Sequence, residues 1–493
     1  MTGPDLHLQQ MDAMHSHTSM FAPWALLPTG WAADVSLSWG SDGRYQRVEA
    51  GTRPQPDMVH AVGPVLPGVT NLHSHAFQRA FAGLTEYRAE DADSFWSWRT
   101  LMYGFAAAIS PEQVEAVATF LYGEMLAAGY TSVCEFHYLH HDTGGRPYAD
   151  TATLAQALLR AAKRSGIHIT LLPVLYQAAG FGGTPLGTGQ QRFGHTLDSM
   201  QRLLQALAPQ CAAQGARLGL APHSLRAVPP QALTAALAML DDLDPTAPVH
   251  IHIAEQTKEV DDCLAHTGQR PVDWLLDHAP VDRRWCLVHA THMTPDESRR
   301  AARSGAVAGL CPSTEANLGD GIFDMAPWRE GQGAWGVGSD SHACVNAAQE
   351  LELLEYSQRW LRRQRNVLAD PVRVHVAEAM MQAAVVGGAQ AAGRLTPTAR
   401  GPGAAAVDQP ATTGLQVGAP ADAVVLDAHD ALLGGLGPQD MLSAHVFASH
   451  RQSAIAQVWA GGVLRATGGR HLSHEGDAAR FVEARRALLD RMA

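Results

Sequence analysis

Short apolar runs alternate with amphipathic stretches from Val65 to about residue 394. The apolar runs are rich in β-branched and aliphatic residues, and the stretches between them have the spacing of helices. The runs begin near residues 64, 131, 168, 217, 248, 285, 306 and 334. Alternation of this kind predicts a parallel sheet, and eight βα units are the number that closes a (β/α)8 barrel of the TIM type.

Helix boundary residues support the same arrangement. The stretch "SPEQVEAVATFLYGEMLAAG" begins with Ser110 as a candidate N-cap and Pro111 at the first helical position, and it ends at Gly129. Serine accepts hydrogen bonds from free N–H groups, proline needs no N–H there, and glycine readily ends a helix. The segment therefore predicts one helix of the barrel's outer layer.

Both ends of the chain have a different pattern. Short β-like runs around the turn "GSDG" precede the barrel, and "LQVGAPADAVVLD" and "AIAQVWAGGVLRA" follow it. We expect these segments to pair with each other in a small β-sandwich domain. The predicted divisions are a flexible extension 1–20, β-domain segments 21–63 and 414–470, the barrel 64–394, a flexible Pro/Gly/Ala-rich linker 395–413 and a C-terminal helix 471–493.

Composition narrows the class of protein. The chain has 493 residues, a formal charge of −12, 46% hydrophobic residues and 17% charged residues. Clustered basic residues are scarce, and the run "RWLRRQR" is typical of a solvated helix face, so we expect no nucleic-acid partner. No run of apolar residues is long enough to span a membrane. The six scattered cysteines predict reduced thiols and a cytoplasmic location.

Histidines and carboxylates gather where the predicted strands end. His73 and His75 lie two residues apart at the end of the first run, so on a strand both would point to the same side. An isolated H-x-H in a chain with 25 histidines is a weak signal. However, six of the eight strand ends carry a histidine or a carboxylate. Besides the first, these ends carry the following groups: Glu135, His137 and Tyr138; His223 and Arg226; His250, His252 and Glu255; His289 and His292; and Asp340 and His342. Active sites of such barrels form at this face, which disfavours an inert barrel.

These residue types predict a metal site. His73, His75, His252 and Asp340 would converge on one ion, and imidazole and carboxylate ligands suit zinc or another divalent first-row ion. Glu255 follows His252 by three residues and would lie beside the metal as a general acid/base. His289 could polarise the group under attack, and Asp340 could also help to deprotonate the attacking water.

Several motifs resemble those of a known superfamily. The segments "HSH", "HIAE", the histidine of "VHA" and the aspartate of "GSDSH" resemble the amidohydrolase superfamily in its mononuclear deaminase branch, over residues 60 to 470. The blocks "LHSHAFQRAFAGLTE", "FWSWRTLMY", "CEFHYLHH", "APHSLRAV" and "VHIHIAEQ" resemble the formimidoylglutamate deiminases (N-formimino-L-glutamate iminohydrolases) of histidine degradation.

The resemblance implies one zinc per subunit, a homodimer, and hydrolysis of N-formimino-L-glutamate to N-formyl-L-glutamate and ammonia. It also implies that Gln78, Arg99, Tyr138, His223 and Arg226 surround the substrate. A small-molecule substrate with two carboxylates needs cationic partners, and arginine supplies bidentate hydrogen bonds.

Two alternatives stay open at this point. The same barrel and metal could serve a deaminase of a purine or pterin amine, or the fold could be a non-catalytic scaffold. The sequence also leaves open the native metal, the oligomeric state, the roles of His250, His292 and His342, and the roles of the N-terminal extension and residues 395–413.

Overall fold

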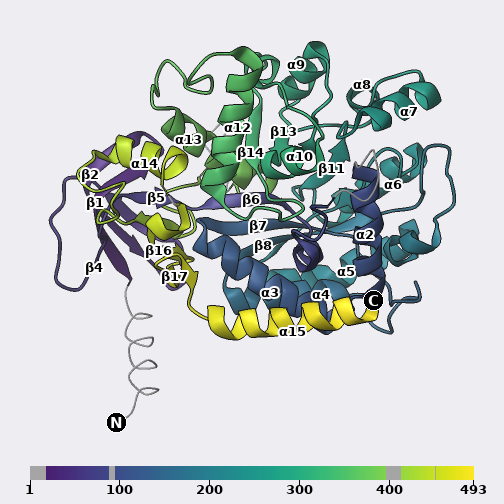
Figure 1. Cartoon of the computed structure of the whole chain (residues 1–493), viewed down its shortest axis with the longest axis horizontal. Coiled ribbons are helices and arrows are strands. Elements are labelled where there is room, and N and C mark those ends of the chain that lie inside the picture. Colours follow the sequence, from purple (N-terminus) through teal and green to yellow (C-terminus); the bar gives the residue numbers. More distant parts are fainter. Residues whose placement is uncertain (1–17, 88–94, 396–411, 450, 493) are drawn as a thin grey trace, which may run out of the picture.

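The computed structural model describes residues 18–87, 95–395, 412–449 and 451–492. Most of the predicted extension 1–20 and linker 395–413 therefore lies outside the described residues. A barrel and a smaller sheet lie side by side, with the purple and yellow ends of the chain meeting in the smaller sheet (Figure 1).

The predicted (β/α)8 barrel is confirmed. Its parallel strands are β6 (Val69–Ser74), β7 (Tyr130–His137), β8 (His168–Leu175), β9 (Arg217–Leu218) with β10 (Ala221–Pro222), β11 (Val249–Ile253), β12 (Trp285–His289), β13 (Val307–Leu310) and β14 (Ala334–Val337). They form two parallel arcs, β6-β7-β8-β10 and β11-β12-β13-β14. Parallel bridges between Leu220 and Val249 and between Ser74 and Asp340 connect the arcs.

Helices cover the outside of the barrel. They are α2 (Phe95–Ala108), α3 (Pro111–Ala127), α4 (Thr153–Ser165), α5 (Leu197–Gln214), α6 (Pro230–Leu243), α7 (Thr257–Thr267), α8 (Pro271–His278), α9 (Pro295–Arg303), α10 (Pro312–Leu318), α11 (Met325–Glu330), α12 (Ala347–Arg362) and α13 (Val376–Ala391). At the start of α3, the Ser110 hydroxyl accepts a hydrogen bond from the backbone N–H of Gln113, as the sequence predicts. One continuous core fills the space between strands and helices.

The small sheet joins both ends of the chain. Its strands are β1 (Ser19–Leu27), β2 (Gly30–Trp39), β3 (Tyr45–Glu49), β4 (Val59–His60), β5 (Val65–Pro67), β15 (Ala423–Leu426), β16 (Ile455–Ala460), β17 (Val463–Thr467) and β18 (Arg470–His471). Their order is β18-β17-β16-β15-β5-β1-β2-β3, with β4 beside β1. The rings of Trp39 on β2 and Trp459 on β16 lie 5.7 Å apart although three strands separate them, so the sheet folds over its own core.

One predicted barrel strand is shared between the two sheets. The run near residues 64 to 73 divides into β5, which pairs with β15, and β6, which pairs with β7. The switch occurs at Gly68, where an added Cβ would lie only 2.2 Å from the Thr131 hydroxyl. Only a residue without a side chain fits this crossing, which lies later than the predicted boundary at residue 64.

Two C-terminal helices pack against helices of the barrel. Helix α14 (Pro438–Phe447) packs near α12 and α13, and α15 (His474–Met492) lies along α3, where Phe481 stacks on Phe120 with ring centroids 4.5 Å apart (Figure 1). All six cysteines are free thiols. In the described ranges, no helix has both the length and the apolar character required to cross a bilayer.

Candidate active site

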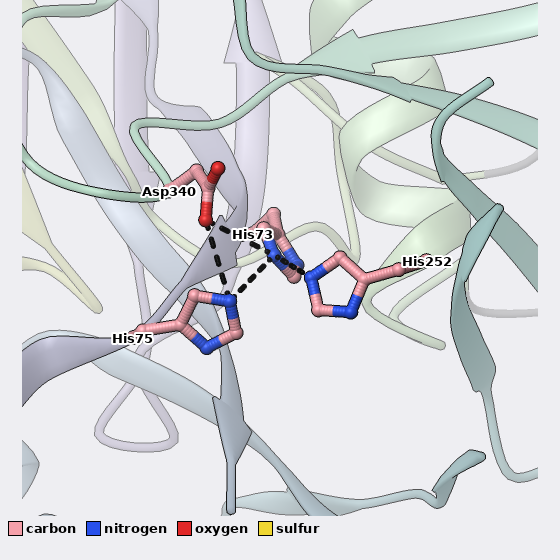
Figure 2. A group of neighbouring side chains, drawn as sticks. All are labelled: His73, His75, His252 and Asp340. Atoms are coloured by element: carbon pink, nitrogen blue, oxygen red, sulfur yellow. Dashed lines mark hydrogen bonds and ion pairs between the residues drawn. The ribbon is translucent and has the colours of Figure 1, made fainter. Parts of the chain in front are cut away.

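Four buried side chains converge at the C-terminal end of the barrel strands. His73 and His75 come from the end of β6, His252 from β11, and Asp340 from the turn after β14. Figure 2 shows their ring nitrogens and one carboxylate oxygen turned toward a shared centre. The His73 Nε2 atom lies 3.1 Å from His75 Nε2, 3.0 Å from His252 Nε2 and 3.4 Å from Asp340 Oδ1.

Hydrogen bonds on the far side of two rings fix their tautomer. His75 Nδ1 donates to the backbone carbonyl of Phe136 at 2.9 Å, and His252 Nδ1 donates to that of His223 at 3.2 Å. With the proton on Nδ1, each Nε2 presents a lone pair to the centre. This is how metal-ligating histidines are oriented in proteins.

The charge states also suit a cation. Burial and neighbouring His75 lower the pKa of His73 to about 3, and burial lowers the pKa values of His75 and His252. Burial alone would raise the pKa of Asp340, but the histidines around it hold that pKa well below its usual range. Neutral imidazoles and an ionised carboxylate are the forms that bind metal, so the four residues fit a zinc-type ion.

The backbone is strained at the ends of these strands. Ala254, His289, Asp340 and His342 all have positive φ angles, between 43° and 65°. Such angles are uncommon for residues other than glycine, and they gather at functional sites because packing must impose them. Here they occur at or next to Glu255, His289 and Asp340, which line one pocket.

Close contact between β6 and the turn after β14 holds two ligands in register. The Asp340 N–H donates to the His73 carbonyl at 3.0 Å, and a Cβ at Gly338 would lie 2.7 Å from His73 N. Asn71 exchanges two hydrogen bonds with Ser339, at 2.6 and 3.1 Å. Glycine at 338 thus permits the approach that places Asp340 beside the histidines.

Glu135 and His342, to which the sequence analysis assigned no role, hold the segment of His73 and His75 through hydrogen bonds. Glu135 accepts hydrogen bonds from the Ser74 hydroxyl at 2.6 Å and from the Ala76 N–H at 2.7 Å. His342, buried between Ser339 and Ser74, has ring nitrogens 2.9 and 3.3 Å from their hydroxyls. Both residues therefore position the end of β6, which carries His73 and is followed by His75.

Glu255 and His289 form a buried pair beside the four ligands. The Glu255 Oε1 atom lies 3.7 Å from His289 Nε2, which is also 3.7 Å from Asp340 Oδ2. Burial raises the pKa of Glu255. Burial acts to lower the pKa of His289, but the nearby carboxylates, Glu255 first, outweigh it and raise the pKa to about 10. The pair can therefore hold and move a proton next to the metal position.

Two carboxylates that sequence reasoning missed position this pair. Glu315 on α10 lies with Oε1 3.4 Å from His289 Nδ1. Glu259 on α7 accepts the N–H groups of Ala254 and Glu255 at 3.2 and 3.3 Å, and its Oε2 lies 3.6 Å from Arg226 Nη1. Glu259 thus links the acid/base residue to a predicted substrate residue. Its sequence signal is only its position four residues after Glu255 at the start of a helix.

All five predicted substrate residues line one pocket. This pocket is also lined by His75, His252, Glu255, His289 and Asp340. Gln78 donates to the Tyr138 hydroxyl at 2.9 Å, and the Arg99 guanidinium lies 4.9 Å from the centre of the Tyr103 ring. The predicted substrate residues are thus brought together with the predicted metal and catalytic residues; His73 alone is not part of the lining.

The chain is similar in sequence to known metal-dependent hydrolases. The sequence profile of the amidohydrolase family matches residues 65–396. The chain belongs to the amidohydrolase family. The profile described as "Formimidoylglutamate deiminase HutF, N-terminal domain" matches residues 17–59, which include β1 to β3 of the small sheet.

Individual relatives show which members of the amidohydrolase family this chain is similar to. It is 48% identical to a Pseudomonas aeruginosa protein named formimidoylglutamate deiminase, over 96% of this chain and 100% of the relative. The resemblance seen in the sequence motifs is thereby confirmed. An 8-oxoguanine deaminase of the same organism is 27% identical over 58% of this chain and 61% of its own length.

Solved structures share the whole fold. A crystal structure titled as an amidohydrolase from Brucella melitensis has a TM-score of 0.87 and 45% identity, covering 96% of this chain and 99% of that chain. A structure titled as an adenosine deaminase from Xanthomonas campestris with bound zinc has a TM-score of 0.75 at 22% identity, covering 96% and 98%. At that identity the second likeness shows the fold alone.

Two of the other histidines at the strand ends have backbone partners. His250 Nε2 lies 2.8 Å from the carbonyl of Ala391, and His292 Nε2 lies 2.8 Å from that of Asp320. These contacts tie β11 to the end of α13 and the segment after β12 to the loop at Asp320.

Proposed function

We propose that this amidohydrolase hydrolyses N-formimino-L-glutamate to N-formyl-L-glutamate and ammonia, with one zinc ion per subunit. The observation that carries the proposal is the single pocket in which a metal-type ligand cluster and an acid/base pair face two arginines. The 48% identical relative with this activity in its name supports the choice of substrate.

His73, His75, His252 and Asp340 would hold the zinc ion. When bound, zinc supplies Lewis acidity and lowers the pKa of a coordinated water to about 7. The tautomers fixed at His75 and His252 orient the ligands before the ion arrives.

The chain's own residues would manage the protons. Asp340 Oδ2, which faces His289, takes part in removing a proton from the attacking water. Glu255 carries protons to the nitrogen that leaves, while the positive charge on His289 stabilises the addition step. One water molecule is consumed: its oxygen bonds to the formimino carbon, the bond to the terminal nitrogen breaks, and that nitrogen gains two protons and departs as ammonia.

Arg226 and Arg99 would bind the two carboxylates of the substrate. Arg226 already pairs with Glu259, which holds its guanidinium at the pocket wall near Glu255. A substrate carboxylate would complete the arginine's hydrogen bonding through the fork geometry that suits carboxylates. Gln78, Tyr138 and His223 would line the space between these contacts and the metal.

The direct test is one reaction of the purified, zinc-loaded protein with N-formimino-L-glutamate. Ammonia is followed with a coupled assay, and the organic product is identified by mass spectrometry. Ammonia together with N-formyl-L-glutamate is the expected result. Formamide and glutamate, or no ammonia from protein shown to contain zinc, would overturn the proposal.

Arg226→Met tests the substrate class. We expect KM to rise by about 10- to 100-fold because a charged hydrogen bond to the substrate is lost. A purine or pterin amine has no carboxylate for this arginine, so turnover of such an amine by wild type, unaltered in R226M, would favour the alternative deaminase. The likeness to an 8-oxoguanine deaminase makes 8-oxoguanine the first such amine to assay.

The proposal includes a cytoplasmic homodimer. The six free thiols support a reducing compartment. Light scattering on the purified protein would measure the assembly, and a monomer at assay concentration would remove the dimer from the proposal.

A further inference from the structure

We propose a second ligand site, for a small aromatic carboxylate, in a cavity that shares Arg226 with the active-site pocket. This cavity, here called the side pocket, is lined by side chains from the segments 180–183, 225–231 and 263–267 and by Trp274. It lies among the loop after β8 and helices α6, α7 and α8, on one side of the barrel (Figure 1). Its volume of about 400 Å³ is enough for a molecule of one or two rings.

The walls of the side pocket are mainly apolar. Phe181, Leu225, Val228 and Trp274 contribute side chains, and the Phe181 ring packs against that of His266 on α7 with 5.7 Å between centroids. All of the lining residues belong to the described range 95–395, and none of them is an aspartate or glutamate. The walls therefore suit a flat apolar group and offer no carboxylate to a cationic ligand.

Arg226 supplies the charge that favours an anion. Of the described residues, only Arg226 lines both the side pocket and the active-site pocket. Its side chain is 12% exposed, and its Nη1 lies 3.6 Å from Glu259 Oε2, which is longer than a hydrogen bond. No described residue accepts a hydrogen bond from its Nε. A largely buried guanidinium with free N–H groups is stabilised by a carboxylate, which can accept two of them.

The start of α6 adds a second group of donors at the side pocket. Pro229 precedes the helix and Pro230 is its first residue, so neither the side chain nor the backbone N–H of these residues caps it. The first N–H to bond along the helix is that of Leu233, to the Pro229 carbonyl at 2.9 Å. The N–H groups of Gln231 and Ala232 remain for an acceptor, and the positive end of the helix favours an anion there.

Helix α7 connects the side pocket to the catalytic residues. Cys263, His266 and Thr267 line the side pocket, and Glu259 lies one turn before Cys263 on the same helix. Glu259 accepts the backbone N–H of Glu255 at 3.3 Å and pairs with Arg226. A carboxylate in the side pocket would compete with the substrate for Arg226 and so raise KM. This consequence rests on the proposed function, whereas binding in the side pocket does not.

The test is calorimetric titration of the zinc-loaded protein with 2-naphthylacetate and with its neutral analogue, 2-naphthylacetamide. We expect one equivalent of the acid to bind, about tenfold or more tighter than the amide, because the amide lacks the charge that Arg226 recognises. Absence of binding, or equal affinities for acid and amide, would overturn the site. Arg226→Met should lose most of the preference for the acid, and a preference that is fully retained in R226M would also overturn it.

Kinetics test the connection to the active-site pocket. At a saturating concentration of 2-naphthylacetate, KM for N-formimino-L-glutamate should rise by about tenfold while kcat stays the same. An unchanged KM would overturn the competition for Arg226. Binding of the acid by protein that does not turn over N-formimino-L-glutamate would support the site and contradict only the proposed function.

Two variants that fill the side pocket show where the acid binds. Gln231→Trp and His266→Trp each place a large side chain at an exposed position of its lining, so the fold should tolerate both. Each should weaken binding of 2-naphthylacetate by about tenfold or more and leave KM and kcat unchanged without it. Ala238→Trp is the matched control, because Ala238 is exposed two turns further along α6 and does not line the side pocket. Binding that survives in both Q231W and H266W, or that is lost in A238W, would overturn the site.

Discussion

Two groups of closely packed histidines lie in this barrel, and only one of them has the geometry of a metal site. In the ligand cluster, His73, His75 and His252 turn their Nε2 atoms toward one another and toward Asp340. The second group, here called the structural histidine cluster, contains a ring pair that is closer still: 4.3 Å separates the centroids of its closest pair, against 4.6 Å in the ligand cluster. Its members are His137, His140, His141 and His195.

The difference lies in where the ring nitrogens point. In the structural histidine cluster, His140 and His141 donate from Nε2 to the carbonyls of Val174 and Gly194, at 3.0 and 2.6 Å. Among the described residues, no carboxylate pairs with these rings. Burial of histidines therefore does not indicate a metal site. A metal site is indicated by convergent ring nitrogens that carry no proton and lie next to a carboxylate.

Removal of the Asp340 carboxylate should have the largest effect, because it removes the feature that distinguishes the ligand cluster from the structural histidine cluster. For Asp340→Asn we expect no measurable deiminase activity and zinc affinity weakened more than about 100-fold, because the neutral amide neither balances the ion nor accepts a proton. Zinc content after dialysis and the ammonia assay measure both effects. His195→Gln in the structural histidine cluster is the control and should keep its zinc; stoichiometric zinc in D340N would contradict the assignment.

Glu255→Gln should separate acid/base chemistry from metal binding. We expect kcat to fall by about 10²- to 10⁴-fold, because the amide cannot carry protons, while zinc content stays at the wild-type level. Steady-state kinetics and metal analysis of the same sample check this. Glu355→Gln changes another buried glutamate, one that holds the N–H groups of residues 367 and 368, and should leave kcat unchanged. Loss of zinc from E255Q would make Glu255 a ligand instead.

Glu259→Gln tests a residue that positions both Arg226 and Glu255. We expect KM to rise by about tenfold, since the charge that holds Arg226 is removed, with a smaller fall in kcat through the Glu255 turn. Kinetics and thermal melts of the variant are measured together. A lower melting temperature with unchanged KM would show that Glu259 only stabilises the fold.

The smallest expected effect is on the pH dependence of stability, through His137 of the structural histidine cluster. Burial lowers the pKa of His137 to about 3 from an ordinary value near 6.5. Below pH 6.5 the unfolded chain binds a proton that the folded chain does not, so this residue's effect is to reduce stability as the pH falls from 6.5 toward 3. His137→Phe should therefore lose about 1.6 kcal/mol less stability than wild type between pH 6.5 and 5.

Denaturant unfolding at several pH values measures that difference. Zinc should stabilise wild type and H137F equally, because His137 is not a ligand. Equal slopes against pH in the two proteins would mean that His137 is protonated in the folded state.

Much of the fold was accessible from the sequence. The eight strand-like runs correspond to the barrel strands, because each is a local apolar pattern bounded by turn residues. The division of the first run at Gly68 was not predicted, since it depends on the contact with Thr131, which selects a residue without a side chain.

The candidate ligands were accessible for a related reason. H-x-H at a strand end and polar residues at the other strand ends follow from the period of a β-strand and from the barrel's geometry. Glu259 and Glu315 were not accessible, because each sits in an ordinary helical segment. Their roles depend on contacts with Arg226 and His289, which are far away along the chain.

The sequence by itself determined the barrel, the residue types at its C-terminal end and membership of the amidohydrolase family, because local apolar periodicity and short motifs encode them. Only the tertiary structure decided which nitrogens face one another, which tautomers are held and which oxygen of Asp340 faces His289. Those properties depend on distances of a few ångströms between strands that close the barrel from opposite ends of the chain, and no local pattern records them.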